Sequence, residues 1–216
     1  MQGPAALPFV HCSEALIVVD KPSGLLSVPG RGAHLQDCVA TRVQAEFADA
    51  LIVHRLDMAT SGLLLLARGA AVQRALSIAF ARREVDKRYV AVVAGLLPPP
   101  PGDGWGEVDL ALAADWPARP KQKVDASGKP SLTRYRVLAH DVQRRCTRVE
   151  LQPLTGRSHQ LRVHMLELGF PILGDTLYAP PEVQAQSTRL LLHASALELA
   201  HPVSGERLRF ASETPF

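Results

Sequence analysis

Residues 54–68 read HRLDMATSGLLLLAR, and this stretch decides most of what the sequence predicts about the fold. The apolar run Gly62–Arg68 has the length and composition of a buried strand. A strand is also predicted just before it, over Leu51–His54, so the polar residues Asp57–Ser61 turn between two strands. Rigid strands on both sides of a turn hold its side chains in place. Asp57 is therefore the first candidate for a functional group.

The role of Asp57 stays open when the turn is considered alone. Its carboxylate can cap the turn by accepting hydrogen bonds from the backbone amides of Met58 to Thr60. Arg55 lies two residues away, on the same face as Asp57 if the strand continues. An acid and a cation on one face form either a structural ion pair or a reactive acid beside an arginine that contacts phosphate or a base.

Short strands outnumber helices in the rest of the chain. Apolar residues at helical spacing predict helices over Leu35–Phe47, Ala70–Arg83 and His159–Leu168. Further strands are predicted over residues 15–20, 88–97, 108–112, 132–138, 146–151 and 190–199. Because these strands often follow one another directly, we expect an α+β fold with a mixed, mostly antiparallel sheet rather than a doubly wound α/β fold.

The composition is that of an ordinary folded protein, with 216 residues of which 47% are hydrophobic. The prolines Pro98–Pro101 form a loop, which we interpret as an excursion within one domain. No apolar run approaches the ~20 residues of a membrane helix, and the N-terminus lacks a secretory pattern. Cys12, Cys38 and Cys146 show no CxxC spacing, so a disulfide framework and a zinc finger are not expected, and a reducing compartment fits.

Positive charge is unevenly distributed although the net charge is only +3. Residues 57–150 carry 15 basic and 10 acidic side chains, whereas the remaining residues carry 9 and 11. The excess gathers in two clusters, which are Arg82, Arg83, Lys87 and Arg88, and Arg119, Lys121 and Lys123. Such clusters either bind phosphate groups or form an ordinary solvated surface.

A second group of polar residues, Thr155–His164, shares a short helix with an apolar stripe. His159 and Arg162 are three residues apart and are therefore neighbours on the helix surface. His159 and His164 are five apart, a spacing that does not align two metal ligands on a helix, so no metal site is expected. Arg162 can equally be a surface arginine whose stem packs along Met165.

Tyr89, at the start of a predicted strand, is the remaining candidate. Considered alone, it is a half-buried tyrosine with its hydroxyl at the rim of the sheet. The sequence has no glycine-rich phosphate loop, because neither GxGxxG nor GxxxxGK occurs. Taken one at a time, none of these features identifies a function.

Taken together and in this order, the motifs resemble the RluA-type pseudouridine synthase family. Besides residues 54–68, the resemblance is carried by Asp20–Arg31, Asp86–Val93, Thr155–Met165, Gly169–Ala179 and Arg189–Ala194. Asp115–Val124 further resembles a family member that modifies both rRNA and tRNA. The resemblance spans nearly the whole chain. It implies a single catalytic domain over residues 1–216, without the separate N-terminal RNA-binding domain of many relatives.

The resemblance implies an enzyme that isomerises uridine in RNA to pseudouridine, in an RNA-binding cleft flanked by helices and loops, without cofactor or metal. Asp57 would attack the flipped-out nucleotide, at the ribose C1′ or at the uracil ring, with Arg162 as its basic partner and Tyr89 as the pocket tyrosine. Arg55 would fill the space that the base leaves. The further RNA contacts predicted from motif or charge are Arg88, Arg119, Lys121, Lys123, Arg157, His159 and Gln160.

The family member with two substrates modifies a loop uridine of 23S rRNA and an anticodon-loop uridine of tRNA. We expect the same substrates here, bound by a cytoplasmic monomer. Two other functions stay open, an RNA-binding module without catalysis and a hydrolase that pairs Asp57 with a second acid. Asp86 and Asp175 are the acids nearest in the motifs, and neither has an obvious reason to face Asp57.

Overall fold

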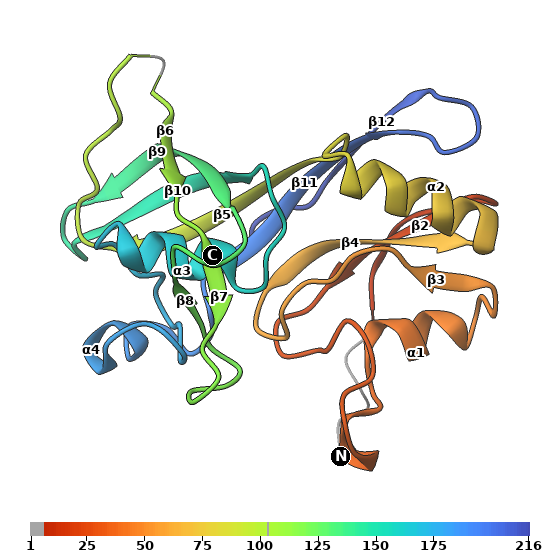
Figure 1. The fold of residues 1–216 in the computed structure, drawn as a ribbon, viewed down its shortest axis with the longest axis horizontal. Helices are drawn as coiled ribbons and strands as arrows, with labels where there is room; N and C mark the ends of the chain where they lie inside the picture. Colours follow the sequence, from red (N-terminus) through yellow and green to blue (C-terminus); the bar gives the residue numbers. More distant parts are fainter. Residues whose placement is uncertain (1–6, 103) are drawn as a thin grey trace. The chain divides into compact units, whose positions relative to one another are not determined.

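The computed structural model describes residues 7–102 and 104–216 and contains two compact units. The first unit comprises the described residues up to Asp86 together with Ala194–Pro215, and the second comprises Lys87–His193 with Phe216. Within each unit, short antiparallel strands predominate and the helices are few (Figure 1). The predicted α+β class with a mostly antiparallel sheet is confirmed.

Two buried strands, β2 and β4, form the centre of the first unit and pair antiparallel, with Val18 opposite Leu65. On their outer sides β1 pairs with β2 and β3 pairs with β4, while β12 pairs with β11. The bounds of these strands are β1 (Phe9–Cys12), β2 (Leu16–Lys21), β3 (Ala50–Ile52), β4 (Ser61–Arg68), β11 (Leu192–Ala200) and β12 (Arg207–Ala211).

Helices on both faces explain why β4 contains four consecutive leucines, Leu63–Leu66, all of them fully buried. Helix α2 (Ala70–Ala81) packs against one face of β4, and α1 (Val39–Gln44) lies on the opposite side (Figure 1). A strand covered on both faces has no solvent side, so its sequence is a continuous apolar run instead of an alternation. Burying each leucine contributes roughly 1.5–3 kcal/mol.

Helix α2 confirms the helix predicted from apolar spacing over Ala70–Arg83. Leu76 is buried among residues of β2 and β4, and Val72, Ala79 and Phe80 pack against the same cluster. These four positions are the ones that the helical periodicity selects. The helix ends two residues earlier than predicted, with Arg82 as its C-cap and Arg83 in a left-handed conformation (φ 63°).

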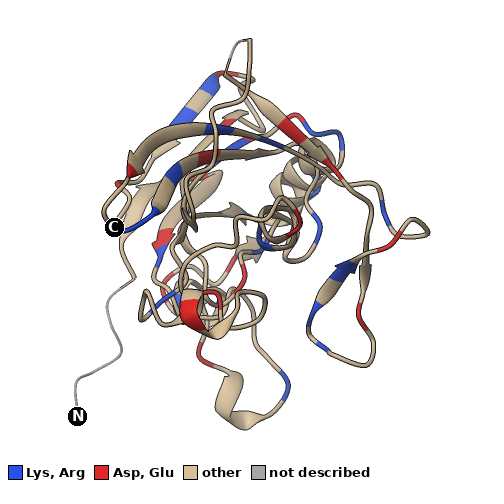
Figure 2. Cartoon of the chain, turned by 90° about the vertical axis from the view of Figure 1, so that its left-hand side faces the viewer, with Lys and Arg blue, Asp and Glu red and all other residues tan. Residues whose placement is uncertain are grey.

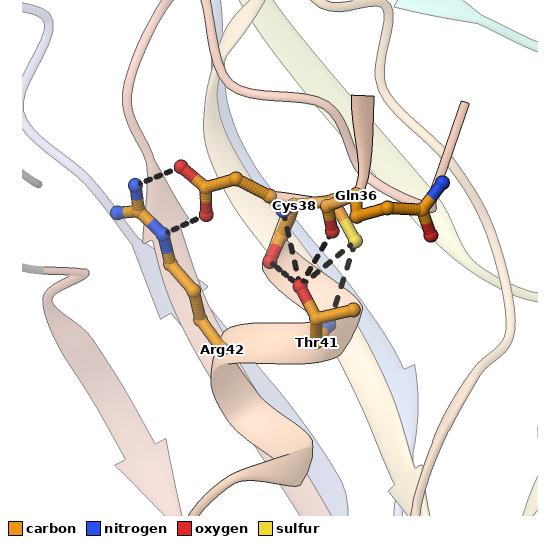
Figure 3. Close-up of polar contacts among 5 residues, drawn as sticks. Gln36, Cys38, Thr41 and Arg42 are labelled. Atoms are coloured by element: carbon orange, nitrogen blue, oxygen red, sulfur yellow. Dashed lines mark hydrogen bonds and ion pairs between the residues drawn. The ribbon is translucent and has the colours of Figure 1, made fainter. Parts of the chain in front are cut away.

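Helix α1 is shorter than the predicted Leu35–Phe47, and its start is fixed by a cysteine. Cys38 is extended (φ −156°), and its Sγ accepts a hydrogen bond from the Thr41 N–H at 3.4 Å (Figure 3). In return, the Cys38 N–H donates to Thr41 Oγ1 at 3.1 Å (Figure 3). This reciprocal capping box sets the first helical residue at Val39, where apolar spacing alone does not reveal it.

The second unit contains a four-stranded arrangement in the order β5-β10-β9-β6 and a separate hairpin of β7 and β8. Its helices α3 (Gln160–Glu167) and α4 (Pro181–Gln184) are short. The strands are β5 (Asp86–Ala94), β6 (Gly106–Asp109), β7 (Leu112–Ala114), β8 (Gln122–Val124), β9 (Leu132–Asp141) and β10 (Cys146–Pro153).

The two faces of the β5-β10-β9-β6 sheet differ in character. Thr133 of β9 is buried and hydrogen-bonds to residues of α3, so that face packs against the helix. The other face carries charged cross-strand pairs, among them Arg136 with Glu150. Acidic segments accompany basic ones on several strands of the protein (Figure 2). Opposite charges directly across antiparallel strands stabilise the pairing by a few tenths of a kcal/mol to ~1 kcal/mol.

Among the residues that the structure describes, no helix combines the length and the apolar character needed to cross a membrane.

Candidate active site

Asp57 lies in a loop that begins earlier than predicted, because β3 ends at Ile52 and not at His54. Its main-chain oxygen accepts a hydrogen bond from the Thr60 N–H at 3.1 Å, which closes the turn before β4. Since the strand does not continue, the condition for placing Arg55 and Asp57 on one face is not met: Arg55 is exposed, whereas Asp57 is half-buried.

The backbone next to Asp57 is held by a fully buried lysine, Lys21, at the end of β2. Its ammonium group donates to the carbonyl oxygens of Pro22 at 2.9 Å, Leu25 at 2.7 Å and Met58 at 3.0 Å. These three acceptors match the three donors of an ammonium group, and charge-assisted hydrogen bonds are among the strongest in proteins. Lys21 thus links the end of a core strand to the residue that follows Asp57.

The segment after Lys21 holds the other side of the same loop. Ser27 Oγ donates to the Leu56 carbonyl at 2.7 Å and accepts from the Leu56 N–H at 3.1 Å. Ser23 Oγ donates to the Ala59 carbonyl at 2.7 Å, and the Gly24 N–H donates to the Met58 carbonyl at 2.8 Å. The main chain is therefore fixed immediately before and after Asp57, so the backbone position from which its carboxylate extends is also fixed.

His54 anchors the start of this loop. Its Nε2 accepts a hydrogen bond from the Leu65 N–H at 3.0 Å, so this nitrogen carries no proton in the structure. Its ring stacks on Phe80 of α2, with centroids 4.6 Å apart and planes 25° from parallel. His54 consequently ties the loop to both β4 and α2.

In the second unit, Arg162 on α3 is buried and forms a bidentate ion pair with Asp175. Arg162 Nε lies 2.8 Å from Asp175 Oδ2, and Nη2 lies 2.6 Å from Oδ1. Asp175 Oδ1 also accepts hydrogen bonds from the N–H groups of Leu177 and Tyr178, at 3.0 and 3.2 Å. Arg162 is thus not a surface arginine, and Asp175 faces Arg162.

A glycine places Asp175 at this position. Gly174 adopts φ +71°, and a Cβ built there would lie 1.9 Å from the Arg189 carbonyl oxygen. Only glycine fits so tight a left-handed turn. The turn directs Asp175 back towards α3.

Tyr178 connects Arg162, His159 and the β7–β8 hairpin. Its hydroxyl oxygen accepts from the Gln122 N–H at 2.8 Å and lies 2.6 Å from His159 Nδ1. The Arg162 guanidinium lies 5.1 Å from the Tyr178 ring centroid, within cation–π range. Since the hydroxyl accepts from Gln122, its own proton is available to His159. One side chain therefore fixes three elements of the unit.

Gln160 has a different position from the RNA contact predicted for it, because its side chain is buried. Its Oε1 accepts from Thr155 Oγ1 at 2.7 Å and from the Arg157 N–H at 3.0 Å. Its Nε2 donates to the Leu132 carbonyl and to Thr133 Oγ1, both at 3.0 Å. These four bonds hold the loop before α3 against β9, so Gln160 supports the loop from within.

The helix that carries Arg162 begins one residue later than the predicted His159. The N-cap is His159, in a left-handed conformation (φ 55°), and no side chain caps the helix there. The His159 carbonyl accepts from the Val163 N–H at 3.0 Å, which starts the helix. The left-handed backbone at His159 turns its ring towards Tyr178. The three-residue spacing to Arg162 assumed instead that His159 lies within the regular helix.

His164 on α3 is fully buried and uses both ring nitrogens. Nε2 lies 3.1 Å from the Leu110 carbonyl, which can only accept, so Nε2 carries the proton. Nδ1 lies 2.9 Å from Thr133 Oγ1. Burial lowers the pKa of His164, and the neutral ring fits these two bonds. The structure thus gives His164 a structural position.

Tyr89 and Arg88 are adjacent on β5 and point to opposite faces of the sheet. Tyr89 is half-buried and lies opposite Leu151, a core residue. Arg88 lies on the charged face, with Nη1 3.7 Å from Glu150 Oε1 and its guanidinium 5.3 Å from the Trp105 ring centroid. The two residues therefore do not act at the same face.

The remaining predicted RNA contacts lie at or near the surface. Arg119 is exposed and Lys123 is 53% exposed by its side chain, while Lys121 between them is half-buried. Arg157 Nε donates to the Pro130 carbonyl at 3.2 Å. No group of three or more His, Cys, Asp or Glu suited to a metal ion occurs within residues 7–102 and 104–216.

Residues 15–167, well over half of the chain, match the family described as RNA pseudouridylate synthase. The chain belongs to this family. The synthase is 50% identical to the Dual-specificity RNA pseudouridine synthase RluA of Escherichia coli (strain K12), over 97% of this chain and 94% of the relative. It is 51% identical to the enzyme of the same name from Yersinia pestis, over 93% and 96% of the two chains.

A solved structure has the same fold as the synthase. It is the Human RNA Pseudouridylate Synthase Domain Containing 1, with a TM-score of 0.80 and 28% identity, covering 100% of this chain and 87% of that chain. The Human RNA Pseudouridylate Synthase Domain Containing 4 gives a TM-score of 0.76 and 25% identity over 96% and 88%. The resemblance that the motifs of the sequence indicated is confirmed.

The residues that sequence reasoning missed are those that position the synthase's candidate site. Lys21, Ser27, Asp175 and Tyr178 all lie in motifs that carried the family resemblance, and of these only Asp175 was considered, as a second acid for a hydrolase. A lysine directly after an apolar strand was the available signal for Lys21, because an ammonium group at the end of a core strand requires carbonyl partners. The roles of Asp57, Tyr89 and Arg162 stay predictions.

Proposed function

We propose that this synthase converts uridine to pseudouridine in stem-loops of both rRNA and tRNA. The full-length match to dual-specificity synthases supports two substrates. The structural observation that carries the proposal is the double anchoring of the Asp57 loop, by Lys21 on one side and by Ser27 on the other. A loop fixed by a core strand presents a carboxylate in one geometry, which is what a reactive group needs.

The proposed reaction is an isomerisation in which nothing is gained or lost. The Asp57 carboxylate attacks the flipped-out nucleotide, at the ribose C1′ or at the uracil ring, and the bond between N1 and C1′ breaks. The uracil then turns and C5 forms a bond to C1′. The bond between the Asp57 carboxylate and the nucleotide breaks, the proton leaves C5, and N1 gains one. A carboxylate suits this reaction because it can stabilise or trap an electron-poor sugar carbon.

In this proposal both units belong to one catalytic domain, and Arg162 and Tyr89 act on the nucleotide that Asp57 attacks. Arg162 supplies a guanidinium whose plane Asp175 fixes through two hydrogen bonds. A preoriented charge stabilises a developing anion without reorganising during the reaction. Tyr89 stacks on the uracil from β5. A base inside a helix is inaccessible to these groups, so the uridine is flipped out at a cost of roughly a few kcal/mol.

RNA contacts are proposed for arginines and lysines at or near the surface. Arg55 fills the space that the flipped base leaves, and Arg119, Lys121 and Lys123 bind phosphates. Arg88 contacts RNA from the charged face of the sheet. Arg157, His159 and Gln160 contribute by holding the loop and hairpin in position, as their hydrogen bonds inside the protein indicate. We further propose a monomer acting in the cytoplasm, where tRNA and rRNA are modified.

Two measurements on one reaction test this function. The protein is incubated with a tRNA anticodon stem-loop and with a 23S rRNA stem-loop, and pseudouridine is mapped by carbodiimide treatment and primer extension. We expect a stop at one uridine in each RNA and no free uracil. Free uracil would indicate the hydrolase instead, and RNA binding without product would indicate a non-catalytic module. Asp175 gives the hydrolase little support, because its carboxylate already accepts four N–H bonds.

A further inference from the structure

An exposed tryptophan lies at the tip of the β7–β8 hairpin, among the residues that carry positive charge. Trp116 is 66% exposed, and residues 116–120 are all exposed. The guanidinium of Arg119 lies 3.3 Å from the centroid of the Trp116 ring. Since Arg119 covers one face of the indole, the remaining exposure belongs to the other face and the edge of the ring. A tryptophan ring exposed to this extent leaves a large aromatic surface in water that a binding partner can cover.

The hairpin tip is internally ordered by backbone hydrogen bonds. The Asp115 N–H donates to the Lys121 carbonyl at 2.9 Å, which closes the tip. Within it the Ala118 N–H donates to Asp115 at 3.1 Å, and the Lys121 N–H donates to Ala118 at 3.0 Å. An ordered tip presents the Trp116 ring without a large entropy cost on binding.

The hairpin is also attached to the element that carries Arg162. Gln122, the first residue of β8, donates its N–H to the Tyr178 hydroxyl, and Tyr178 lies under the Arg162 guanidinium. Helix α3 and β8 are in contact. A group bound at Trp116 is therefore held at a defined distance from Arg162 within the second unit.

We propose that Trp116 is a stacking platform for an unpaired base of the substrate RNA, while the Arg119 guanidinium covers the opposite face of its ring. This proposal rests on the proposed function and adds to it a contact that recognises the single-stranded loop. Bases splayed out of RNA loops stack on aromatic side chains regardless of their identity, and a stacked guanidinium strengthens the interaction. Lys121 and Lys123 bind the phosphates on either side of that base.

The proposed platform explains how one site accepts two loops of different sequence. Stacking tolerates any base because every base has an aromatic face. Hydrogen bonding to a base edge, in contrast, would restrict the sequence at that position. Trp116 thus recognises an unpaired nucleotide near the target, and the chemistry at Asp57 selects uridine.

The test uses Trp116 as its own reporter, because the chain has two tryptophans, Trp105 and Trp116. In the Trp105→Phe protein, Trp116 emission is titrated with an anticodon stem-loop RNA and with a fully paired RNA duplex of equal length. We expect saturable quenching by the stem-loop, at the concentrations at which it binds, and much weaker quenching by the duplex. Binding of the stem-loop without a change in emission would overturn the proposal.

Substitutions separate stacking from charge. Trp116→Ala is expected to raise the Kd for the stem-loop by roughly tenfold. Trp116→Phe should keep most of the affinity, because its ring still stacks. Val142→Ala, a matched exposed apolar position of the second unit at 69% exposure, should change nothing. Equal affinities of Trp116→Ala and the Val142→Ala control would contradict the platform.

Measuring product formation distinguishes a failure of the stacking platform from a failure of the proposed function. Pseudouridine is measured with the same RNA and the Trp105→Phe protein. Product together with unquenched Trp116 would overturn the stacking platform alone. Absence of both product and quenching would overturn the proposed function and the platform with it.

Discussion

The guanidinium of Arg162 and the carboxylate of Asp175 form a buried bidentate ion pair, with the contacting atoms 2.8 and 2.6 Å apart. Two parallel hydrogen bonds fix the plane of the guanidinium as well as its position. Asp175 in turn is fixed by two backbone N–H groups. The arginine proposed to assist Asp57 is thus oriented before any RNA binds.

We expect Asp175→Ala to lower the free energy of unfolding by about 3–5 kcal/mol, because it leaves the Arg162 charge buried without its carboxylate. Turnover should fall as well, since the guanidinium loses its fixed plane. Urea unfolding and single-turnover kinetics measure the two effects. Asp141→Ala serves as the control, because its ion pair with Arg144 is exposed. Similar losses in both variants would show that Asp175 has no special role.

Lys21→Met tests the anchoring of the Asp57 loop. The methionine fills a similar volume but leaves the carbonyls of Pro22, Leu25 and Met58 without the ammonium donor. We expect a loss of about 3 kcal/mol in unfolding free energy, because buried acceptors lose charged hydrogen bonds. The remaining folded protein should also turn over more slowly. Lys129→Met, at an exposed lysine for which no RNA contact is proposed, should behave like the wild type. A fully active, equally stable Lys21→Met would refute the anchoring.

Local sequence patterns predicted the core elements well because their signals lie within single segments. The apolar run of β4 and the helical periodicity of α2 each depend on a few neighbouring residues. The short strands β1, β8 and β12 were missed, because they lie outside the strong apolar runs and depend on a partner strand for their pairing.

The supporting residues of the candidate site depend on contacts between distant positions. Asp175 meets Arg162 only because of the tight turn at Gly174, and no periodicity reveals that turn. Asp57, in contrast, stood out because a carboxylate between two strong strand signals is a local pattern. The local pattern therefore singled out Asp57 as a candidate and the family resemblance implied its role, whereas the network that supports the loop required the structure.

His164 makes the stability of the protein dependent on pH. Burial lowers its pKa in the folded state, while the unfolded chain binds a proton near the ordinary value of about 6.5. The unfolded state therefore binds more protons as the pH falls below about 6.5, and stability decreases there; above that value the contribution is fully present. Unfolding free energies at pH 7.5 and 5.5 should differ more for the wild type than for His164→Gln. His34→Gln, at an exposed histidine, should keep the wild-type difference.

Tyr178→Phe removes one hydroxyl and keeps the ring beneath Arg162. Gln122 then loses its acceptor and His159 its partner, so we expect stability to fall by about 1–2 kcal/mol. The KM for RNA should rise several-fold with a smaller change in kcat, because the hairpin is less well positioned while the Arg162–Asp175 pair persists. Steady-state kinetics on a stem-loop separate the two constants. Tyr135→Phe is the matched control, and an equal response of both variants would contradict a special role for Tyr178.

The central claim is that the carboxylate of Asp57 is the reacting group, and Asp57→Asn tests it with almost no change in shape. Pseudouridine is measured in an anticodon stem-loop by carbodiimide primer extension, and RNA affinity is measured with the same preparation. We predict no detectable product, with a Kd within about threefold of the wild type, because the amide cannot act as the nucleophile while the anchored loop persists. Undiminished product from Asp57→Asn would contradict the account.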